Sequence, residues 1–358
     1  MLYMDCLKMG SNQKLETGNS KRYGKMKALF LLKSDKTPSS RIRVLDLIPV
    51  LRENGIEPDV EILPDSFWKR RELFKRAKDY PVTVLQKRLL SIFDFRELRK
   101  NAKRLVFDFD DAIYYKNASC SADPADYESS TRKGKFRRTA AGSDLIIAAN
   151  NVLAGKAREF NRSVPVEIIP SSVDVRAFIP KGDYNLSSPP VVGWIGTKST
   201  LRYLELISSA FTELRSKRDF VLRIVSNEPY RQDGINIEFV RWSLENQNAE
   251  LGKFDIGIMP LSGDPFSEGK ASYKLLQYFA AGLPSVCSPV GMNSDVAGNG
   301  EYCLTASDSG EFASQMLKLL DNCELRRSLG LNGRKLVERK YCLEVVASKL
   351  AGVLLERQ

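Results

Sequence analysis

An α/β fold of two doubly wound domains is predicted by three features of the sequence. Short, almost wholly apolar runs alternate with helical patterns, which is typical of parallel sheets that helices cover on both faces. This alternation fills the first half of the chain and begins again in the second half. A chain of 358 residues is also too long for one ordinary hydrophobic core, so two domains are expected.

In the first half, the apolar runs predict the strands of a Rossmann-like domain over residues 26–175. The runs lie at residues 27–33, 60–63, 82–86, 104–110, 144–149 and 166–170. Helical patterns separate them, for example at 40–54 and 66–79. Residues 1–25 are polar and do not resemble a signal peptide, so we expect a disordered extension there, with Met26 opening the domain.

The second half predicts another Rossmann-like domain over residues 191–340. Its apolar runs lie at residues 191–196, 220–226, 235–240, 254–260, 284–288 and 301–305. A helix is expected at 199–217, with Ser199 as its N-cap. The stretch rich in Pro, Ser and Gly predicts a linker at 176–190. Residues 341–358 predict a C-terminal helix that packs back on the first domain.

The composition excludes several kinds of chemistry. The chain has no histidine, which excludes Ser-His-Asp and Cys-His catalysis, a His general base and His-ligated metals. Its six cysteines are scattered without a Cys-x-x-Cys pair, which argues against a zinc site or a disulfide framework and for a reducing cytosol. The chemistry must therefore use carboxylates, lysines, arginines, hydroxyls or the substrate itself.

The net charge of +11 lies in the first half of the chain. Residues 26–180 hold 29 basic and 21 acidic side chains, whereas residues 181–358 hold 21 of each. A basic half implies an acidic partner, which is a nucleic acid, an anionic membrane surface or a phosphorylated substrate.

Ligands of doubly wound folds bind beyond the carboxyl ends of the strands, so a cleft between two such sheets is the expected site. At one strand end, the stretch EGKASYKLLQYFAAGLPSVCSPVG (268–291) predicts a helix and a short strand. Lys270, Lys274 and Gln277 are spaced as one helical stripe. Two ammonium groups beside a helix N-terminus favour an anion such as a phosphate. A solvated lysine face is the alternative.

Two further strand ends add to this prediction. Gly196 allows a ligand close to the backbone, the Ser199–Thr200 helix start offers N–H groups, and Lys198 adds a positive charge. Trp242 follows the third strand of the second half and either stacks on a base or covers the core edge. A tight turn without a ligand is the alternative for Gly196. Together the three strand ends predict a nucleoside diphosphate site.

These motifs resemble the second domain of a GT-B, family 4-type retaining glycosyltransferase. They are GWIGTKSTLRYLELI, FDIGIMPL and GKASYKLLQYFAAGLPSVCSPVG. Four stretches of the first half resemble the first domain of the bacterial surface-polysaccharide type of that family, namely SSRIRVLDLIPVLRENGIE, VLQKRL, VFDFDDAIY and IIPSSVD. The similarity covers about residues 26–340.

The resemblance implies a GT-B fold, in which two Rossmann-like domains face each other across a cleft. It implies a nucleoside-diphosphate-sugar donor bound mainly by the second domain, an acceptor bound mainly by the first, retention of anomeric configuration, and no metal or other cofactor. Lys270 and Lys274 are the expected catalytic residues, because they would neutralise the leaving phosphate. The expected donor-binding residues are Gly196, Thr197, Lys198, Ser199, Trp242, Pro260, Glu268, Gly269 and Gln277.

The chain departs from the family in one place. The family often carries two Glu separated by seven residues across this helix, but the aligned positions here hold Gly269 and Gln277, with Glu268 one residue away. Gln277 can still hydrogen-bond a ribose hydroxyl, although more weakly than a carboxylate does. The departure leaves an inactive family member used as a scaffold as an alternative.

In the first half, polar side chains at strand ends are expected to bind the acceptor. They are Arg41, Arg43, Lys87, Asp110 and Asp111. The two arginines could clamp a phosphate or simply lie on the surface. The sequence DFDD (108–111) could also be the metal motif of a GT-A fold, a phosphatase nucleophile pair or a helix cap. We expect Asp110 and Asp111 to face the cleft, where they bind acceptor hydroxyls or orient Lys87 and Arg88.

Two basic stretches favour an anionic partner for the first domain. SFWKRRELFKRAK (66–78) interleaves aromatic and basic residues, and RKGKFRR (132–138) adds a second basic cluster. Solvated helix faces are the alternative for both. We expect a cytoplasmic protein that lies peripherally at the inner membrane face and takes a phosphate-bearing or lipid-linked acceptor.

The prediction is therefore a hexosyltransferase that moves a sugar from a nucleotide sugar to a saccharide or lipid-linked acceptor in cell-surface polysaccharide synthesis. A GT-B epimerase or hydrolase that consumes the donor without an acceptor is one alternative. A basic nucleic-acid-binding protein is another, but the sequence offers no recognition helix or base-stacking sheet, so no nucleic acid is expected.

Overall fold

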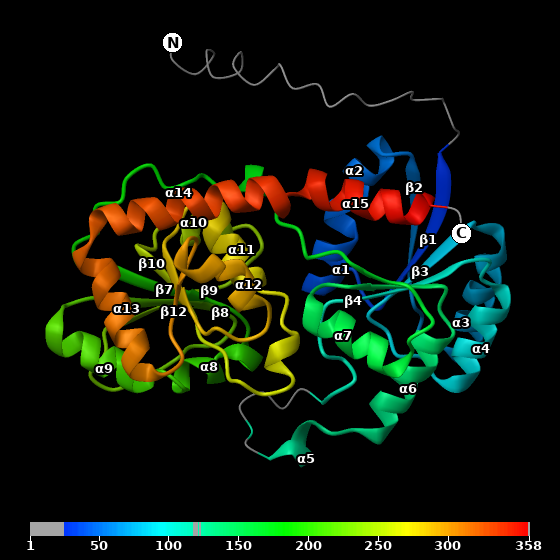
Figure 1. Cartoon of the computed structure of the whole chain (residues 1–358), viewed down its shortest axis with the longest axis horizontal. Helices are drawn as coiled ribbons and strands as arrows, with labels where there is room; N and C mark the ends of the chain where they lie inside the picture. The colour runs from blue at the N-terminus through cyan, green and yellow to red at the C-terminus, as the bar shows by residue number, and fades with distance from the viewer. Residues whose placement is uncertain (1–24, 117–120, 122, 357–358) are drawn as a thin grey trace, which may run out of the picture.

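The computed structural model describes residues 25–116, 121 and 123–356, and these form two α/β domains side by side (Figure 1). The extension predicted at residues 1–25 lies outside the described residues, apart from Lys25. Each domain is built on a parallel six-stranded sheet. No helix in the described part of the chain is long and apolar enough to cross a membrane.

The first sheet has the strand order β2-β1-β3-β4-β5-β6. Its strands are β1 (Met26–Leu32), β2 (Ile56–Ile62), β3 (Val82–Gln86), β4 (Leu105–Phe109), β5 (Leu145–Ala148) and β6 (Val166–Ile168). Its helices are α1 (Pro38–Arg43), α2 (Ile48–Glu53), α3 (Phe67–Lys75), α4 (Ile92–Asn101), α5 (Pro124–Tyr127), α6 (Ser130–Ala141) and α7 (Asn151–Phe160). The strand predicted at 60–63 begins earlier, and Pro58 is tolerated there because β2 lies at the sheet edge.

The second sheet has the order β12-β11-β10-β7-β8-β9. Its strands are β7 (Val191–Ile195), β8 (Val221–Ser226), β9 (Ile237–Arg241), β10 (Ile256–Met259), β11 (Ser285–Cys287) and β12 (Leu304–Thr305). Its helices are α8 (Arg202–Glu205), α9 (Ser208–Lys217), α10 (Gln247–Leu251), α11 (Tyr273–Ala280), α12 (Met292–Ala297) and α13 (Ser309–Asp321). The predicted fold class of two Rossmann-like α/β domains is confirmed.

The single helix predicted at 199–217 is wrong. The chain forms a short 3-10 turn, η4 (Lys198–Thr200), followed by α8 and α9. Thr197, rather than Ser199, is the N-cap, and its backbone N–H donates to the Thr200 hydroxyl (3.1 Å). The Thr200 hydroxyl donates in turn to the Thr197 carbonyl (3.0 Å), so these two residues close the turn on themselves.

The order of the strands reverses at one place in each sheet. In the first sheet β2 lies on one side of β1 and β3 lies on the other side, so the order reverses between β1 and β3. In the second sheet the reversal lies between β7 and β10. Such reversals leave a crevice at the carboxyl ends of the strands, where ligands of these folds bind. The loops after these four strands are therefore the natural walls of a site.

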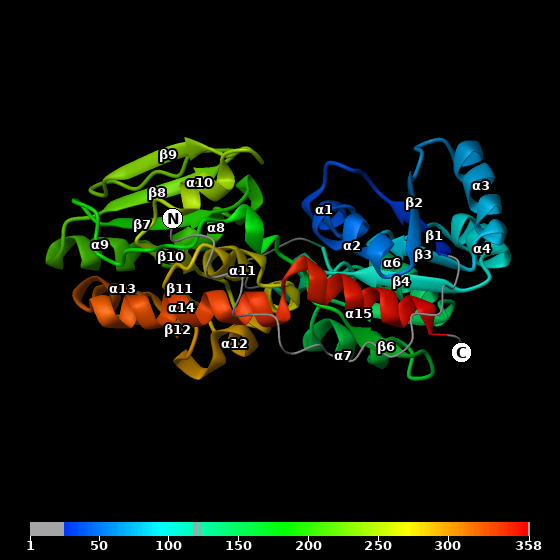
Figure 2. The ribbon, with the colours of Figure 1, turned by 90° about the horizontal axis from the view of Figure 1, so that it is seen from above.

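The last two helices join the two domains. α14 (Cys323–Lys340) packs beside α11 in the second domain, and α15 (Leu343–Leu355) crosses to the first domain (Figures 1 and 2). Apolar residues of α15, such as Val346 and Leu350, share a core cluster with Phe30 of β1. The guanidinium of Arg104 donates to the carbonyl of Leu354 (2.8 Å) at the end of α15. The C-terminal helix therefore completes the covering of the first sheet.

A buried ion pair fixes α1 against the first sheet. The Nε atom of Arg43 donates to both carboxylate oxygens of Asp108 (3.1 and 3.0 Å), and Nη1 donates to the carbonyl of Ile169 (2.9 Å). Arg43 and Asp108 are both buried. The prediction that Arg43 clamps a phosphate of the acceptor is therefore wrong, because Asp108 and Ile169 occupy its guanidinium.

Replacing Arg43→Met should lower the free energy of unfolding by about 3–5 kcal/mol, because it leaves the carboxylate of Asp108 buried without a counter-charge. Urea unfolding followed by circular dichroism measures this change. Arg52→Met is the matched control, since the Arg52–Glu57 pair (2.9 Å) is exposed and should cost about 0–1 kcal/mol. Equal costs for the two variants would contradict the structural role of Arg43.

Candidate active site

A cleft of about 420 Å³ lies where the two sheets face each other. Its first-domain wall comes from the loops after β1 and β4, and its second-domain wall comes from the loops after β7, β9 and β10 and from the start of α11. The residues that line it include Ser39, Arg41, Asp110, Asp111, Gly196, Thr197, Thr200, Trp242, Gln247, Lys270, Ser272, Tyr273, Lys274 and Gln277. Both sheet reversals therefore open into one cavity.

The start of α11 differs from the sequence prediction. The helix begins at Tyr273, so Lys270 precedes it, and only Lys274 and Gln277 lie on the predicted helical stripe. Ser272 explains the late start, because its backbone is left-handed (φ 50°) and its hydroxyl donates to the side chain of Asn293 (2.7 Å). No described side chain caps α11, so its first N–H groups, which have no intrahelical partner, are open at the cleft wall.

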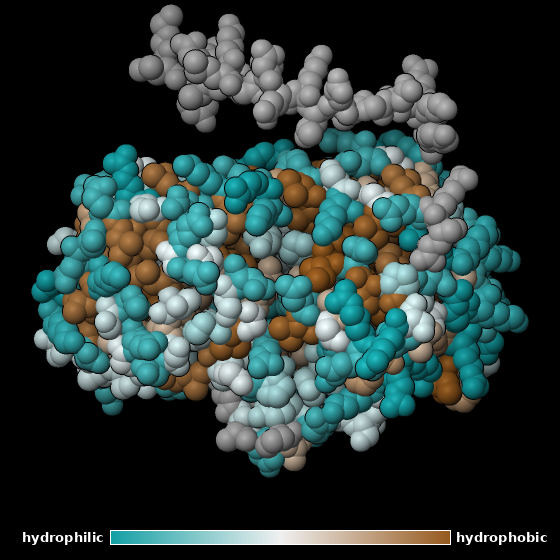
Figure 3. Space-filling view, in the orientation of Figure 1, coloured by the Kyte–Doolittle hydropathy of each residue, from teal (hydrophilic) through white to brown (hydrophobic). Residues whose placement is uncertain are grey.

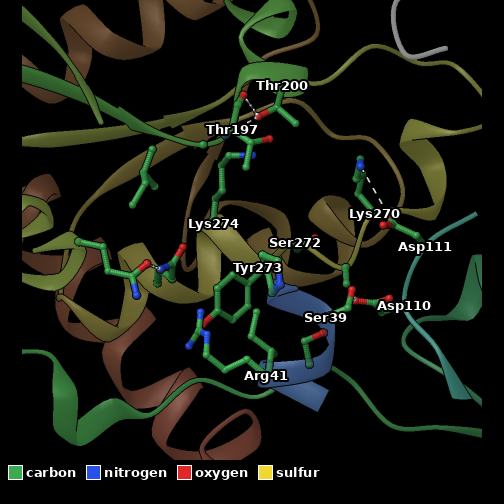
Figure 4. Close-up of a pocket in the computed structure, with 18 of the residues that line it drawn as sticks. Ser39, Arg41, Asp110, Asp111, Thr197, Thr200, Lys270, Ser272, Tyr273 and Lys274 are labelled. Atoms are coloured by element: carbon green, nitrogen blue, oxygen red, sulfur yellow. Dashed lines mark hydrogen bonds and ion pairs between the residues drawn. The ribbon is translucent and has the colours of Figure 1, made fainter. Parts of the chain in front are cut away.

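Lys270 reaches across the cleft from the second domain to the first. Its ammonium group lies 3.4 Å from a carboxylate oxygen of Asp111 and 4.5 Å from the ring centre of Phe266 (Figure 4). Burial acts to raise the pKa of Asp111, but Lys270 and Lys87 outweigh it and lower that pKa below its usual range. Asp111 therefore stays ionised and holds Lys270 at the domain boundary.

Lys274 stands in a different environment, although it is only one turn away. Figure 4 shows its side chain extending from α11 toward the Thr197–Thr200 turn. Its ammonium group lies 5.4 Å from the ring centre of Trp194. Burial, together with the positive charge of Lys270, lowers the pKa of Lys274 to about 7. Among the residues that the structure describes, no carboxylate forms an ion pair with Lys274, so its ammonium group strongly attracts an anion.

The turn after β7 leaves no space for a side chain at Gly196. A Cβ atom there would lie 2.3 Å from the ring of Trp194 and 2.7 Å from the Thr200 hydroxyl. The N–H of Gly196 donates to the carbonyl of Val225 (3.0 Å). Since Thr197 also donates within the turn, these two N–H groups are used internally. The glycine brings the turn close to the cleft, but the N–H groups of Gly196 and Thr197, two of the residues expected to bind the donor, already have partners in the protein.

Three side chains are hydrogen-bonded to one another at another part of the wall. The Oε1 atom of Gln247 accepts from the indole Nε1 of Trp242 (3.3 Å) and from Nε2 of Gln277 (3.2 Å). Trp242 and Gln277 were predicted in the donor site, and the structure brings both to the cleft. Gln247 was missed, because it lies on a short polar helix without a recognisable motif.

In the first domain, Ser39, Asp110 and Asp111 line the cleft, whereas Lys87, which was predicted to bind the acceptor, contacts them without lining the cleft. The ammonium group of Lys87 contacts Asp110 (2.9 Å) and Asp111 (2.7 Å) and donates to the hydroxyl of Ser39 (2.7 Å). The hydroxyl of Ser39 donates in turn to Asp110 (Figure 4). The expectation that Asp110 and Asp111 face the cleft and orient Lys87 agrees with this geometry. Ser39 was not predicted.

Arg41 lines the cleft next to this cluster. It pairs with Asp46 (3.1 Å) and lies beside the ring of Tyr273 (Figure 4). Burial raises the pKa of Tyr273 to about 12, so its hydroxyl stays protonated near neutral pH. Together the two domains present cationic, carboxylate and hydroxyl groups to the same space.

Five of the residues predicted to bind the donor do not line the cleft. Lys198 is 78% exposed and faces Glu228 (3.8 Å), Ser199 and Glu268 are exposed, and Pro260 is buried behind the wall. Gly269 instead packs on the first domain, since a Cβ atom there would lie 2.8 Å from the Cβ of Ala112. Of these five, the alignment with the family concerned only Gly269 and its neighbour Glu268, and both precede α11, which begins at Tyr273.

The DFDD stretch does not form a metal site here. Asp108 pairs with Arg43, and Asp110 and Asp111 pair with Lys87. In residues 25–116, 121 and 123–356 no group of three or more acidic or cysteine side chains is placed to hold a metal ion.

Comparisons with known proteins agree with this architecture. Residues 189–322 match the family model described as "Glycosyl transferases group 1". No curated protein matches the chain.

Solved structures match over almost the whole chain. Sucrose-phosphate synthase from Thermosynechococcus elongatus has a TM-score of 0.72 at 16% identity, covering 92% of this chain and 98% of that one. Anabaena HepE in complex with UDP-glucose has a TM-score of 0.68 at 13% identity, covering 92% and 99%. A glycosyltransferase from Rickettsia africae has a TM-score of 0.67 at 13% identity, covering 94% and 100%. The predicted GT-B fold is confirmed, and the match to the group 1 glycosyl transferase model lies within the second domain.

Lys274 should titrate with a pKa near 7, so that it is charged below this pH and neutral above it. Lys270→Met should raise this pKa, because it removes a neighbouring positive charge. NMR of the protein carrying ¹³C-methylated lysines measures both values, and Lys274→Met assigns the resonance. A Lys274 resonance that titrates as an ordinary lysine, with a pKa of about 10.4, would contradict the burial of this side chain.

Proposed function

We propose that the chain is a retaining glycosyltransferase that moves a hexose from a nucleoside-diphosphate sugar to a saccharide or lipid-linked acceptor in cell-surface polysaccharide synthesis. One observation carries the proposal. The cleft places the cationic, uncapped start of α11 opposite a cluster of carboxylate and hydroxyl groups on the other domain. The wall formed by α11 of the second domain suits an anionic leaving group, and the wall formed by the first domain suits sugar hydroxyls.

The start of α11 would bind the diphosphate. Its first N–H groups and the ammonium group of Lys274 line the same wall. A bound phosphate favours the charged form of Lys274, so the pKa of this side chain would rise on binding. As the bond to the sugar breaks, negative charge grows on the departing phosphate, and a preorganised ammonium group stabilises that charge. We expect the lysines to supply this charge without a metal ion.

Lys270 would change partner when the donor binds. In the structure it faces the carboxylate of Asp111 at 3.4 Å, which is long for a direct ion pair. A diphosphate carries more charge than one carboxylate and would draw Lys270 toward the second domain. Asp111 would remain paired with Lys87. Donor binding would thus loosen one contact between the domains without leaving a buried charge unpaired.

The acceptor would lie against the first domain. The carboxyl oxygens of Asp110 and Asp111 accept hydrogen bonds, and Arg41 adds a donor at the same wall. The hydroxyl of Ser39 shows how an alcohol fits there, since it donates to Asp110 and accepts from Lys87. An acceptor sugar hydroxyl would replace or extend this arrangement.

Two structural neighbours support the donor class. HepE was solved with UDP, with UDP and glucose, and with UDP-glucose, and Staphylococcus aureus TarM was solved with UDP. These ligands belong to those proteins, and they make a uridine donor the first one to test here.

Lys270→Met/Lys274→Met should weaken binding of UDP at pH 6.5 by at least roughly tenfold per lysine, because each charge-assisted hydrogen bond to a phosphate contributes about 1.5–3 kcal/mol. Isothermal titration calorimetry measures the affinity, with GDP and ADP as alternative ligands. Lys198→Met is the matched control, since Lys198 lies on the surface outside the cleft. Unchanged affinity in the double variant would contradict the proposed donor site.

Transfer and donor hydrolysis are separated by their products. A transferase releases UDP from UDP-glucose only in proportion to the acceptor that it is given, whereas an epimerase or hydrolase consumes the donor alone. Donor loss that is complete without an acceptor would favour the second function.

An apolar surface on the first domain supports peripheral membrane contact. Phe67 and Trp68 at the start of α3 and Ile92 and Phe93 at the start of α4 are exposed, Trp68 by 72% and Phe93 by 68%. α3 and α4 pack together, and Figure 3 shows an apolar spot at the lower right margin, where Figure 1 places α4. Such aromatic side chains insert at the interface of a bilayer.

The basic residues around this surface contribute less charge than the sequence suggests. Arg70 pairs with Asp94 (3.2 Å) and Arg71 with Glu97 (2.8 Å). The membrane contact proposed here therefore depends mainly on the aromatic residues.

Trp68→Ala/Phe93→Ala should reduce co-flotation of the protein with liposomes of anionic phospholipid by more than half, because it removes the two most exposed rings of this surface. A density-gradient flotation assay measures the bound fraction. Leu331→Ala, at an exposed apolar residue of the second domain, is the control. Binding that is lost in high salt but unaffected by the double variant would show a charge-only contact and would contradict the aromatic one.

A further inference from the structure

A second cavity lies beside the cleft, where the chain crosses from one domain to the other. It has a volume of about 360 Å³. Its walls come from the stretch between α1 and α2, from residues 174–178, from the loop and helix α10 that follow β9, and from the starts of α11 and α15. Cavities of about 300–1,000 Å³ are typical of sites for small molecules. Both domains therefore contribute to a space that is large enough for a ligand.

The backbone around this second cavity is held in place by hydrogen bonds. The N–H of Val173 donates to the carbonyl of Tyr341 (2.8 Å), which joins the two segments that connect the domains. The side-chain amide of Asn248 on α10 donates to the carbonyl of Ala177 (3.1 Å). The connecting segment is thereby fixed to the second domain. A ligand in the second cavity would contact both domains at the point where they are joined.

The second cavity borders the cleft through a shared wall. Arg41, Gln247 and Tyr273 line both spaces. Arg41 comes from the first domain and Tyr273 from the second, and the two side chains lie beside each other (Figure 4). A ligand in the second cavity can therefore contact groups that also face the cleft.

The charged side chains of the second cavity lie in pairs of opposite sign. Arg41 pairs with Asp46 (3.1 Å), and Nε of Arg176 lies 3.5 Å from a carboxylate oxygen of Asp174. Together these four side chains carry no net charge. A guanidinium has several N–H donors and a carboxylate several acceptor sites, so one contact leaves each of them able to bind further groups. The lining therefore offers both donors and acceptors and suits a neutral polar ligand.

Apolar side chains form much of the remaining wall. They are Pro49, Phe178, Leu244 and Leu343, and the ring of Tyr273 adds an aromatic surface. The matching ligand has apolar faces and a rim of groups that can donate as well as accept. A sugar ring has this chemistry, because C–H groups form its faces and hydroxyls surround it.

We propose that the second cavity binds one sugar ring of a saccharide, outside the cleft in which transfer takes place. The inference rests on the proposed function, which supplies the class of ligand. Hydroxyls of the ring donate to Asp46 and Asp174 and accept from the two arginines, while a ring face packs on Phe178 or Tyr273. The ring belongs either to the acceptor, next to its reacting sugar, or to a separate saccharide, and both have the same chemistry.

The first experiment fills the second cavity with a larger side chain. Ala177 lines it and is exposed, so Ala177→Trp should occupy the space without removing a charged group. Labelled protein is applied with UDP to an array of mono-, di- and trisaccharides of glucose, galactose, mannose and N-acetylglucosamine. The wild type should bind a subset of them. Ala177→Trp should bind this subset at least roughly tenfold more weakly, because it displaces two or more hydrogen bonds.

Two further variants show whether the effect belongs to the second cavity. Ala249→Trp is the matched control, since Ala249 is exposed on α10 and is not among the described residues that line either space. It should bind the saccharides as the wild type does, and equal weakening would overturn the inference. Asp46→Asn keeps the shape of the side chain but removes its charge, and should weaken the same saccharides by roughly threefold to tenfold. Unchanged melting temperatures confirm that the variants are folded.

Transfer assays distinguish the two sources of the ring. If the ring belongs to the acceptor, Ala177→Trp should raise the KM for a bound di- or trisaccharide at similar kcat and leave transfer to a monosaccharide unchanged. If the ring belongs to a separate saccharide, this saccharide is not extended but tightens the binding of UDP, and Ala177→Trp abolishes that effect. Two ligands that favour the same arrangement of the domains favour each other in this way.

The outcomes also separate this inference from the proposed function. A wild type that binds none of UDP, GDP and ADP contradicts the proposed function itself. A wild type that binds UDP but no saccharide of the array leaves the proposed function standing and overturns the inference. Equal binding of the saccharides by the wild type and Ala177→Trp overturns it as well, because the saccharides are then bound elsewhere.

Discussion

The contact between the segment Phe266–Ala271 and the first domain is the constraint on which the site depends. Phe266 belongs to the same core cluster as Ala112 and Leu153 of the first domain. The side-chain amide of Asn150 donates to the carbonyls of Gly269 (3.3 Å) and Lys270 (3.1 Å). Since Gly269 has no Cβ, its backbone can lie directly on Ala112. This loop of the second domain is thereby held on the first, and the two sheet reversals face each other.

The same contact explains why two neighbouring lysines differ. Lys270 lies on the held segment and so meets Asp111 of the first domain. Lys274 lies on α11, faces inward over Trp194, and is shifted by burial and by Lys270 to a pKa of about 7. Lys270 therefore contacts the other domain, whereas Lys274 has a charge that an anion could neutralise. A ligand that binds both lysines would have its charge neutralised and would release the contact between Lys270 and Asp111.

The sequence predicts the fold well and the site in part. The apolar runs locate almost all strands, because buried parallel strands are apolar throughout. Contacts between side chains that lie far apart in the sequence cannot be predicted in this way. The sequence suggests that Arg43 is a phosphate ligand, but the fold places Asp108 against it. The sequence also predicts Lys270 on the helix, but the left-handed backbone of Ser272 makes the helix begin after it. Gln247 has no motif at all and becomes visible only when Trp242 and Gln277 are placed beside it.

A crystal structure of the protein with bound UDP would locate the diphosphate in relation to the two lysines. We expect a phosphate within hydrogen-bonding distance of Lys274 and the first N–H groups of α11, with Lys270 turned from Asp111 toward the ligand. A nucleotide bound outside the cleft, or inside it with its phosphates directed away from α11, would contradict the proposed donor site.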